Sequence, residues 1–231
     1  MTTTLITGAN KGLGLETARR LIELGHTVYL GARDVENGTA AAELLGARFV
    51  QIDVTDDASV QAAAASILEE AGHLDVLVNN AGISGSRDEP GDVTADVVRA
   101  VYDVNVFGIV RVTHAMLPLL QKSQAPVVVN VSSGLGSFSR VNDPAHFESS
   151  FATIAYGSSK AAVTALTVQY AKALPAIKFN AADPGYTATD LNRHSGPQTV
   201  TEGTDAIVQL ATIGSNGPTG TFIERAGVVP W

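Results

Sequence analysis

The sequence predicts an α/β fold: a single domain over residues 1–231, built on a Rossmann-type, doubly wound parallel sheet of about seven strands. Short apolar segments alternate along the chain with longer segments of helical spacing, and strands that are apolar throughout are buried on both faces. A length of 231 residues suits one such domain and leaves little room for another. A glycine-rich turn directly after the first apolar segment fits the same class, because it leads the chain sharply from strand to helix.

Seven apolar segments are predicted to form the strands of this sheet. They are Thr3–Thr7, Thr27–Leu30, Arg48–Ile52, Val76–Asn79, Val127–Val131, Ile177–Ala181 and Gly220–Glu224. Helices between successive strands require right-handed crossovers, which make the strands parallel and place helices on both faces. The turns rich in glycine and proline fall largely where strands end, at the edge where open parallel sheets bind their ligands.

Four segments show helical spacing. The first two are indicated by apolar faces formed by Leu13, Thr17, Leu21 and Leu24 and by Val60, Ala64, Ile67 and Leu68, and two longer helices run from about Thr94 to Leu120 and from about Ala155 to Leu174. No internal repeat and no low-complexity linker separates these elements, which again predicts one domain.

The composition excludes several classes of function. The chain has 15 lysines and arginines against 23 aspartates and glutamates, a formal charge of −8. Because such a chain is repelled by nucleic acids and anionic membranes, we expect neither as a partner. It has no cysteine, which excludes disulfides and thiolate chemistry.

No targeting segment, membrane span or metal site is predicted. The start, Met1–Ile6, lacks the basic and apolar regions of a signal peptide, and no segment approaches 18 uninterrupted apolar residues. We therefore expect a cytoplasmic protein. The five histidines show no metal-ligand spacing. His146 and His194 are candidates for the border of a substrate pocket, with ordinary loop histidines as the alternative.

The turn after the first strand is a candidate dinucleotide site. Glycines in the pattern Gly-x-x-x-Gly-x-Gly allow a sharp turn and close approach of the backbone to a pyrophosphate, which the following helix N-terminus would stabilise. The pattern lacks the Gly-Lys-Ser/Thr of a P-loop. The alternative is an ordinary glycine turn. The residues expected to contact the cofactor are Gly8, Asn10, Lys11, Gly12, Leu13 and Gly14.

Arg33, just past the second strand, favours NADP(H) over NAD(H). An acidic residue there would bind the ribose 2′-hydroxyl of NAD, whereas an arginine accommodates the 2′-phosphate of NADP. Lys11 would add a second positive charge. Asp34 keeps NAD(H) open as the alternative, and a surface pair between Arg33 and Asp34 is the ordinary interpretation.

Tyr156 and Lys160 form the candidate catalytic pair. They are four residues apart in a predicted helix and so share a face. A neighbouring ammonium lowers the pKa of a phenol, which lets a tyrosine act as general acid or base. Ser133 follows the fifth strand and could hydrogen-bond the developing alkoxide. The alternative is a tyrosine packed over a lysine stem on the surface.

Asn105 lies within the long predicted helix, where a buried asparagine is unfavourable without a partner. It therefore either holds a water or a backbone carbonyl, or faces solvent as an ordinary polar residue. The segment Asn79–Gly82 ends the fourth strand at the same edge of the sheet as the serines that follow the fifth strand, Ser132 and Ser133.

Taken together, these residues resemble the short-chain dehydrogenase/reductase family over essentially the whole chain. The matching positions are Thr7–Gly14, Asp53, Asn79–Gly82, Asn105, Ser133, Tyr156, Lys160 and Pro184–Thr187. The carbonyl-reductase-like members are the most similar, on Asn10-Lys11, Ala32-Arg33-Asp34 and the terminal Trp231.

The resemblance implies a role for each matching residue. Tyr156 would be the acid/base, Lys160 would lower its pKa and bind the nicotinamide ribose, Ser133 rather than Ser132 would hold the substrate oxygen, and Asn105 would support a proton-relay water. Asp53 would lie near the adenine, Asn79 and Gly82 on the adenosine side, and Thr187 would bind the carboxamide. Val54, Ala81, Pro184 and Gly185 are also expected to contact the cofactor.

One segment departs from the family pattern. Residues Arg140–Phe151 make the separation of Ser133 and Tyr156 longer than usual, yet shorter than in the monomeric carbonyl reductases. This leaves monomer, dimer and tetramer open. Aromatic and aliphatic residues in and near the insertion either form an apolar pocket wall or pack the insertion down: Phe138, Phe147, Phe151, Tyr186 and Leu191.

The function predicted is that of an NADPH-dependent oxidoreductase that reduces a small-molecule ketone, aldehyde or quinone to an alcohol, or catalyses the reverse. Two alternatives are a non-catalytic NADP(H) sensor on the same fold and an NAD-linked alcohol dehydrogenase. A sugar-nucleotide epimerase is disfavoured because few residues follow Pro184, and reduction of a carbon–carbon double bond is disfavoured by family analogy.

Overall fold

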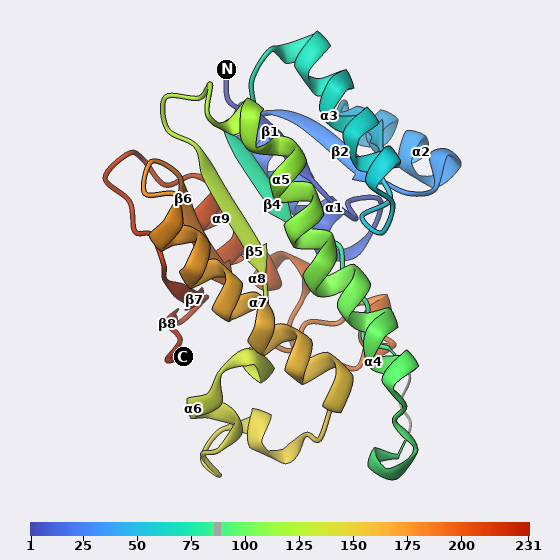
Figure 1. Ribbon diagram of the computed structural model, residues 1–231, viewed down its shortest axis with the longest axis vertical. Coiled ribbons are helices and arrows are strands. Elements are labelled where there is room, and N and C mark those ends of the chain that lie inside the picture. The colour runs from blue at the N-terminus through green and yellow to red at the C-terminus, as the bar shows by residue number, and fades with distance from the viewer. Residues whose placement is uncertain (86–88) are drawn as a thin grey trace.

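The computed structural model, which describes residues 1–85 and 89–231, has the predicted α/β architecture. Its sheet has the strand order β3-β2-β1-β4-β5-β6-β7-β8, and β1 to β7 pair in parallel (Figure 1). The strand order reverses between β1 and β4, as in other doubly wound sheets. This reversal places the turns after β1 and β4 next to each other.

The strands agree with the predicted segments to within two residues. They are β1 Thr3–Ile6, β2 Thr27–Ala32, β3 Arg48–Gln51, β4 Val76–Asn79, β5 Val127–Val131, β6 Lys178–Ala182, β7 Phe222–Glu224 and β8 Gly227–Val228. The additional strand, β8, pairs antiparallel with β7. Sequence patterning does not reveal it because it has two residues, both of them exposed, and thus no apolar run.

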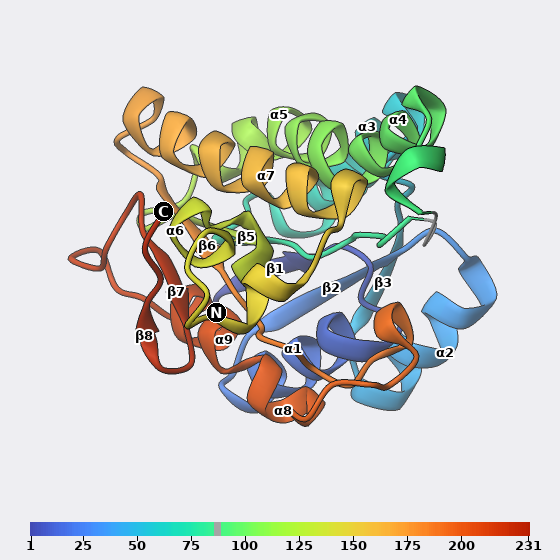
Figure 2. The ribbon, with the colours of Figure 1, turned by 90° about the horizontal axis from the view of Figure 1, so that it is seen from below.

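Helices cover both faces of the sheet (Figure 2). On one face lie α1 (Gly12–Glu23), α2 (Val35–Leu45), α8 (Val200–Gly203) and α9 (Asp205–Ala211), and on the other lie α3 (Asp57–Ala71), α4 (Ala95–Tyr102), α5 (Gly108–Leu120) and α7 (Ile154–Ala173). The short elements are η1 (Pro90–Asp92), η3 (Gly134–Gly136), α6 (Phe138–Val141), η4 (Phe147–Ser150) and η5 (Asp190–Asn192). Among the described residues, two large apolar clusters result, one on each face, and a small third cluster is formed by Ala181, Phe222 and Val229.

The amphipathic faces of α1 and α3 are narrower than predicted. Val60, Ala64 and Ile67 are buried, but Leu68 is 42% exposed. One residue is 100° around a helix, so Leu68 lies well off the stripe that Val60 and Ile67 share. Leu24 is 59% exposed because α1 has already ended at Glu23.

The long predicted helix is continuous but not uniform. A π-helical segment, η2 (Asp103–Phe107), joins α4 to α5. Among the described residues this helix, Ala95–Leu120, meets the length and hydropathy of a membrane span, although 56% of its apolar window is buried inside the protein. Its buried residues Val112, Met116 and Leu120 belong to the apolar cluster between this helix layer and the sheet. We therefore interpret it as a core helix.

Candidate active site

The turn between β1 and α1 is tightly built. Gly8 has a φ of +62°, and a Cβ there would lie 2.9 Å from the Cα of Ala81. The Asn80 side chain donates hydrogen bonds to the carbonyl oxygens of Thr7 (2.8 Å) and Gly8 (3.0 Å). The turn after β4 thus fixes the turn after β1. Sequence reasoning missed Asn80 as a site residue, although it stands beside Asn79 in the chain.

The first turn of α1 is free to bind an anion. Its N-cap, Lys11, makes no side-chain capping bond, and no acidic residue occupies the first turn. The first N–H groups of a helix have no partner within it and carry partial positive charge. A Cβ on Gly14 would lie only 2.6 Å from the carbonyl oxygen of Gly8, so only glycine fits there. The uncapped donors suit a pyrophosphate.

Arg33 and Lys11 stand at the two sides of this turn. The Arg33 side chain is 80% exposed, with its Nε 4.0 Å from Asp53. Lys11 forms a 2.8 Å ion pair with Asp190. Asp34 caps α2, accepting from the N–H of Asn37 at 2.8 Å. Asp34 is the residue that left NAD(H) open as the alternative cofactor, and its carboxylate is engaged in capping α2.

The residues expected at the adenosine side are only partly brought to the edge. The Asp53 carboxylate is partly exposed and accepts two hydrogen bonds from Thr55, whereas Val54 is buried. The Asn79 side chain points into the core and donates to Asn130 at 2.9 Å. Ala81 and Gly82 follow at the strand end. The Asn79 side chain therefore ties β4 to β5, and its contact with the cofactor stays a prediction.

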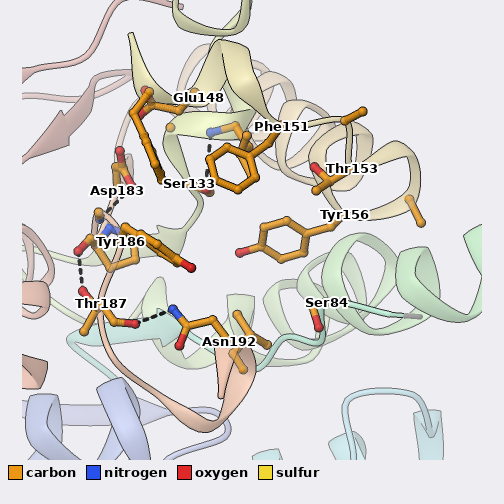
Figure 3. Close-up of a pocket in the computed structure, with 18 of the residues that line it drawn as sticks. Ser84, Ser133, Glu148, Phe151, Thr153, Tyr156, Asp183, Tyr186, Thr187 and Asn192 are labelled. Atoms are coloured by element: carbon orange, nitrogen blue, oxygen red, sulfur yellow. Dashed lines mark hydrogen bonds between the residues drawn. The ribbon is translucent and has the colours of Figure 1, made fainter. Parts of the chain in front are cut away.

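Tyr156 points into a cavity of about 440 Å³ (Figure 3). Ser133 lies beside it, and its hydrogen bond lowers the pKa of Tyr156. Burial, followed by the charge of Asp183, outweighs that bond and raises the Tyr156 pKa above its ordinary value. The hydroxyl of Ser132 instead donates to the carbonyl of Lys160 at 3.2 Å, away from the cavity. Ser133 is thus the serine that faces Tyr156.

Lys160 is buried beneath the Tyr156 ring. Its Nζ lies 5.5 Å from the ring centroid and donates to the carbonyl oxygen of Val131 at 2.8 Å. Burial lowers the Lys160 pKa to about 8, against the opposing charge of Asp183. The Tyr156 pKa is raised overall because burial of the phenol dominates, and the predicted lowering of that pKa by Lys160 stays a prediction.

Asn105 is buried in the π-helical segment and has a full set of partners. Its Oδ1 accepts from the N–H of Ile83 (2.9 Å), and its Nδ2 donates to the Ile83 carbonyl (2.9 Å) and to Ser159 (3.0 Å). A Cβ on Gly82 would lie 3.3 Å from Asn105 Oδ1 and 3.7 Å from Lys160 Nζ. Asn105 therefore joins the turn after β4 to the catalytic helix rather than facing solvent.

The loop after β6 closes the other side of the cavity. Gly185 has a φ of +65°, which favours glycine. Thr187 is buried, and its hydroxyl donates to the Pro184 carbonyl at 2.7 Å. Further along, Asp190 reaches Lys11 of the glycine turn. The structure thus brings Pro184, Gly185 and Thr187 to the same edge as Tyr156.

The insertion supplies an aromatic wall. Phe147 lies 4.6 Å from Phe151 and 5.3 Å from Tyr186 between ring centroids, and Leu191 lines the same cavity. Phe138 is 69% exposed and does not line it, because its helix α6 turns it outward.

The two loop histidines are not part of the cavity lining. His146 lies 3.8 Å from Asp143, and His194 lies 2.9 Å from Asp190. Within the described residues, no group of three or more histidine, aspartate or glutamate side chains is arranged to hold a metal ion. Both histidines are thus ordinary loop residues with carboxylate partners.

Comparison with known proteins gives consistent results. The family model described as short chain dehydrogenase matches residues 2–199. The chain is 33% identical to (−)-isopiperitenone reductase of Mentha piperita, over 96% of this chain and 95% of that protein. Among solved structures, the NADPH-bound carbonyl reductase from chicken fatty liver superposes with a TM-score of 0.89 at 27% identity, covering 100% and 99% of the two chains. Salutaridine reductase from Papaver somniferum gives 0.85 at 28% identity, covering 96% and 99%.

Proposed function

The chain belongs to the short-chain dehydrogenase/reductase family, and we propose that it reduces the carbonyl group of a small molecule to an alcohol, or catalyses the reverse, with NADP(H). One observation carries this proposal. The Tyr156 hydroxyl stands in a cavity beside Ser133, with Lys160 buried beneath its ring, at the sheet edge that also carries the glycine turn. A dinucleotide sensor would not need a proton donor in that position.

The residues at the sheet edge fit NADP(H). The uncapped α1 N-terminus and the close packing of Gly8 and Gly14 suit a pyrophosphate. Arg33 is exposed and available for a 2′-phosphate, while Asp34 is engaged as a helix cap. When bound, the dinucleotide supplies or accepts the hydride. NAD(H) is the less favoured cofactor on the same grounds.

Tyr156 and Ser133 are proposed to act on the substrate oxygen. Ser133 would donate a hydrogen bond to that oxygen as negative charge develops on it. Tyr156 would give its proton to the same oxygen. Because its pKa is raised, Tyr156 is protonated at neutral pH, which suits a general acid in the direction of reduction. Lys160, charged below about pH 8, would stabilise the phenolate left behind.

The proposed substrate is an apolar or aromatic ketone, aldehyde or quinone. Phe147, Phe151 and Tyr186 line the cavity where the carbonyl would enter. Two related proteins are named for reducing isopiperitenone and salutaridine. The cytoplasmic location, the single-domain organisation, the proton-relay role of Asn105 and the oligomeric state stay predictions from the sequence.

The decisive variant is Tyr156→Phe, which removes the proton donor and keeps the ring. We expect turnover to fall by about 10²–10⁴-fold while NADPH binding, measured by fluorescence titration, is retained. Tyr170→Phe is the matched control, because Tyr170 stacks on Phe179 away from the cavity. Normal turnover in Tyr156→Phe would contradict the proposal, and tight NADPH binding by wild-type protein that reduces none of a panel of carbonyls would favour the sensor.

A further inference from the structure

A buried carboxylate that the proposed mechanism does not use lines the active-site cavity. Asp183 follows β6 directly and is 3% exposed. Its backbone N–H donates to the carbonyl of Ile223 at 2.8 Å, which ties it to β7. Figure 3 shows it on the side of the cavity toward which the Tyr156 hydroxyl points, the side on which Ser133 also lies.

The Asp183 carboxylate connects the two loops that flank the expected position of the substrate carbonyl. Its Oδ1 accepts from the N–H of Gly185 at 2.8 Å. Its Oδ2 faces the backbone of Gly134, where a Cβ would lie only 3.0 Å away. The N–H groups of both glycines favour the ionised carboxylate and lower its pKa. Gly134 adjoins Ser133 in the chain, so the carboxylate lies against the loop that carries Ser133.

Arg140 of the insertion holds Asp183 in place. Arg140 is 8% exposed, and its guanidinium lies 3.4 Å from Asp183, 3.2 Å from Glu148 and 2.5 Å from Glu224. One guanidinium therefore forms ion pairs with three carboxylates from three segments of the chain. Burial outweighs these contacts and raises the Asp183 pKa to about 6. Asp183 is thus ionised at neutral pH and becomes protonated under mildly acidic conditions.

We propose that Asp183, held by Arg140, is a positioning residue that fixes Ser133 and the Pro184–Gly185 turn relative to Tyr156. The inference rests on the proposed carbonyl reduction and adds to it a residue outside the positions that match the family pattern. The carboxylate acts through the backbone N–H groups of Gly134 and Gly185, so it need not touch the substrate. The insertion contributes the clamp, which gives Arg140 a function distinct from lining the cavity.

Two effects of the Asp183 charge oppose each other, and their sizes decide the outcome. The groups facing Tyr156 are Lys160 from its own helix, Ser133 and Asp183, with Glu148 lining the same cavity. Removing the Asp183 charge would make Tyr156 a stronger acid, and one pKa unit changes a general acid's rate by at most about tenfold. Misplacing a reacting group by about 1 Å costs roughly 10²-fold. Loss of alignment is therefore the larger effect.

The test uses Asp183→Asn, which keeps the size of the side chain and removes its charge. We expect kcat for reduction to fall about tenfold or more while the KM for NADPH stays within about twofold. Wild-type kcat should also fall as the pH drops through about 6, where Asp183 takes up a proton, and this decline should be absent in Asp183→Asn. A role confined to stability would not move that pH profile.

Glu224→Gln is the matched control. It weakens two hydrogen bonds to Arg140 but contacts neither glycine. We expect nearly wild-type kcat, with the acidic decline kept but moved to lower pH, because the Glu224 charge helps to raise the Asp183 pKa. Equal losses in Asp183→Asn and Glu224→Gln would assign the effect to the insertion clamp and overturn the role of Asp183.

A second variant covers the case in which Asp183→Asn does not fold, which thermal unfolding would reveal. Asp183→Glu keeps the charge but moves it by one methylene, so we expect a lower kcat with the acidic decline retained; an unchanged kcat would overturn the proposal. Normal kcat in Asp183→Asn, alongside an inactive Tyr156→Phe, would overturn this inference alone. Normal turnover in Tyr156→Phe would overturn the proposed function and this inference with it.

Discussion

The ammonium nitrogen of Lys160 lies 5.5 Å from the centre of the Tyr156 ring and donates its hydrogen bond to the carbonyl oxygen of Val131. Spacing along a helix brings the two side chains to one face, but the end of β5 decides where the charge sits. The lysine therefore stabilises the site from beneath the ring, and the phenol keeps its proton because burial dominates its pKa.

The charge of Lys160 predicts an alkaline limit to activity. Burial depresses the Lys160 pKa from its ordinary value to about 8, so the ammonium is charged at pH 7 and is lost as the pH rises through 8. We expect kcat/KM for reduction to fall above about pH 8. The measurement is the rate of NADPH consumption in a series of buffers of constant ionic strength. Lys160→Arg keeps its charge at high pH, so its profile should lack this decline even if its rate is lower.

The same depressed pKa has a consequence for stability. The folded chain binds the Lys160 proton less tightly than the unfolded chain does, so the contribution of this group to stability rises with pH between about 8 and the ordinary lysine pKa. In Lys160→Met this contribution is absent. The difference in unfolding free energy between wild type and Lys160→Met should therefore change over that pH range, and a constant difference would contradict the assigned pKa.

Arg33→Ala should weaken NADPH binding selectively. A charge-assisted hydrogen bond to a phosphate contributes about 1.5–3 kcal/mol, so we expect a loss of roughly 10–100-fold in NADPH affinity and little change for NADH. Arg99→Ala is the control, since Arg99 is 69% exposed and pairs with Asp96 on α4. Equal binding of NADH and NADPH to wild-type protein, measured by calorimetry, would mean that the backbone sets cofactor choice.

Two phenylalanines of the insertion provide a matched test of the substrate wall. Phe151 lines the cavity, whereas Phe138 is 69% exposed and does not. We expect Phe151→Ala to raise the KM for aromatic ketones about tenfold, with a smaller effect on kcat. The reason is that burying a phenylalanine side chain contributes about 1.5–3 kcal/mol of free energy. Phe138→Ala should match wild type in steady-state assays. Equal effects of the two substitutions would place substrate elsewhere in the cavity.

Gly8 and Gly46 separate backbone strain from close contact. Their φ angles are +62° and +67°, but only at Gly8 would a Cβ meet another residue, 2.9 Å from the Cα of Ala81. Urea unfolding should show that Gly46→Ala lowers the free energy of unfolding by about 1 kcal/mol because of backbone strain. Gly8→Ala should lower the free energy of unfolding by about 1–3 kcal/mol more, because the added methyl overpacks the turn. It should also weaken NADPH binding. Similar stabilities would show that the turn after β4 can move away.

Most of the fold was predictable because strands and helices leave periodic patterns in the sequence. The apolar runs of β4 and β5 gave their bounds without error. The strand β8 was not predictable, since its two exposed residues leave no pattern. The π-helical segment around Asn105 was also hidden, because one added residue per turn arises from local packing and not from residue type.

The candidate site was predicted residue by residue but not in its electrostatics. Motif spacing identified Tyr156, Lys160 and Ser133, and the structure places them around one cavity. Motif spacing could not show that Asp34 caps a helix or that the Asn79 side chain turns into the core. It also gave no sign of Asp183 as a partner of the Ser133 loop, because the two are 50 positions apart in the chain.

The sequence by itself determined the fold class, the glycine turn and the catalytic spacing, because each depends on residues that are near neighbours in the chain. Only the tertiary structure decided the protonation of Tyr156 and Lys160, since burial and the charge of Asp183 set both pKa values. It alone also joined Arg140 to Asp183 at the wall of the cavity. Charges interact through space in a low-dielectric interior. Local sequence patterns do not show which charged residues become neighbours when the chain folds.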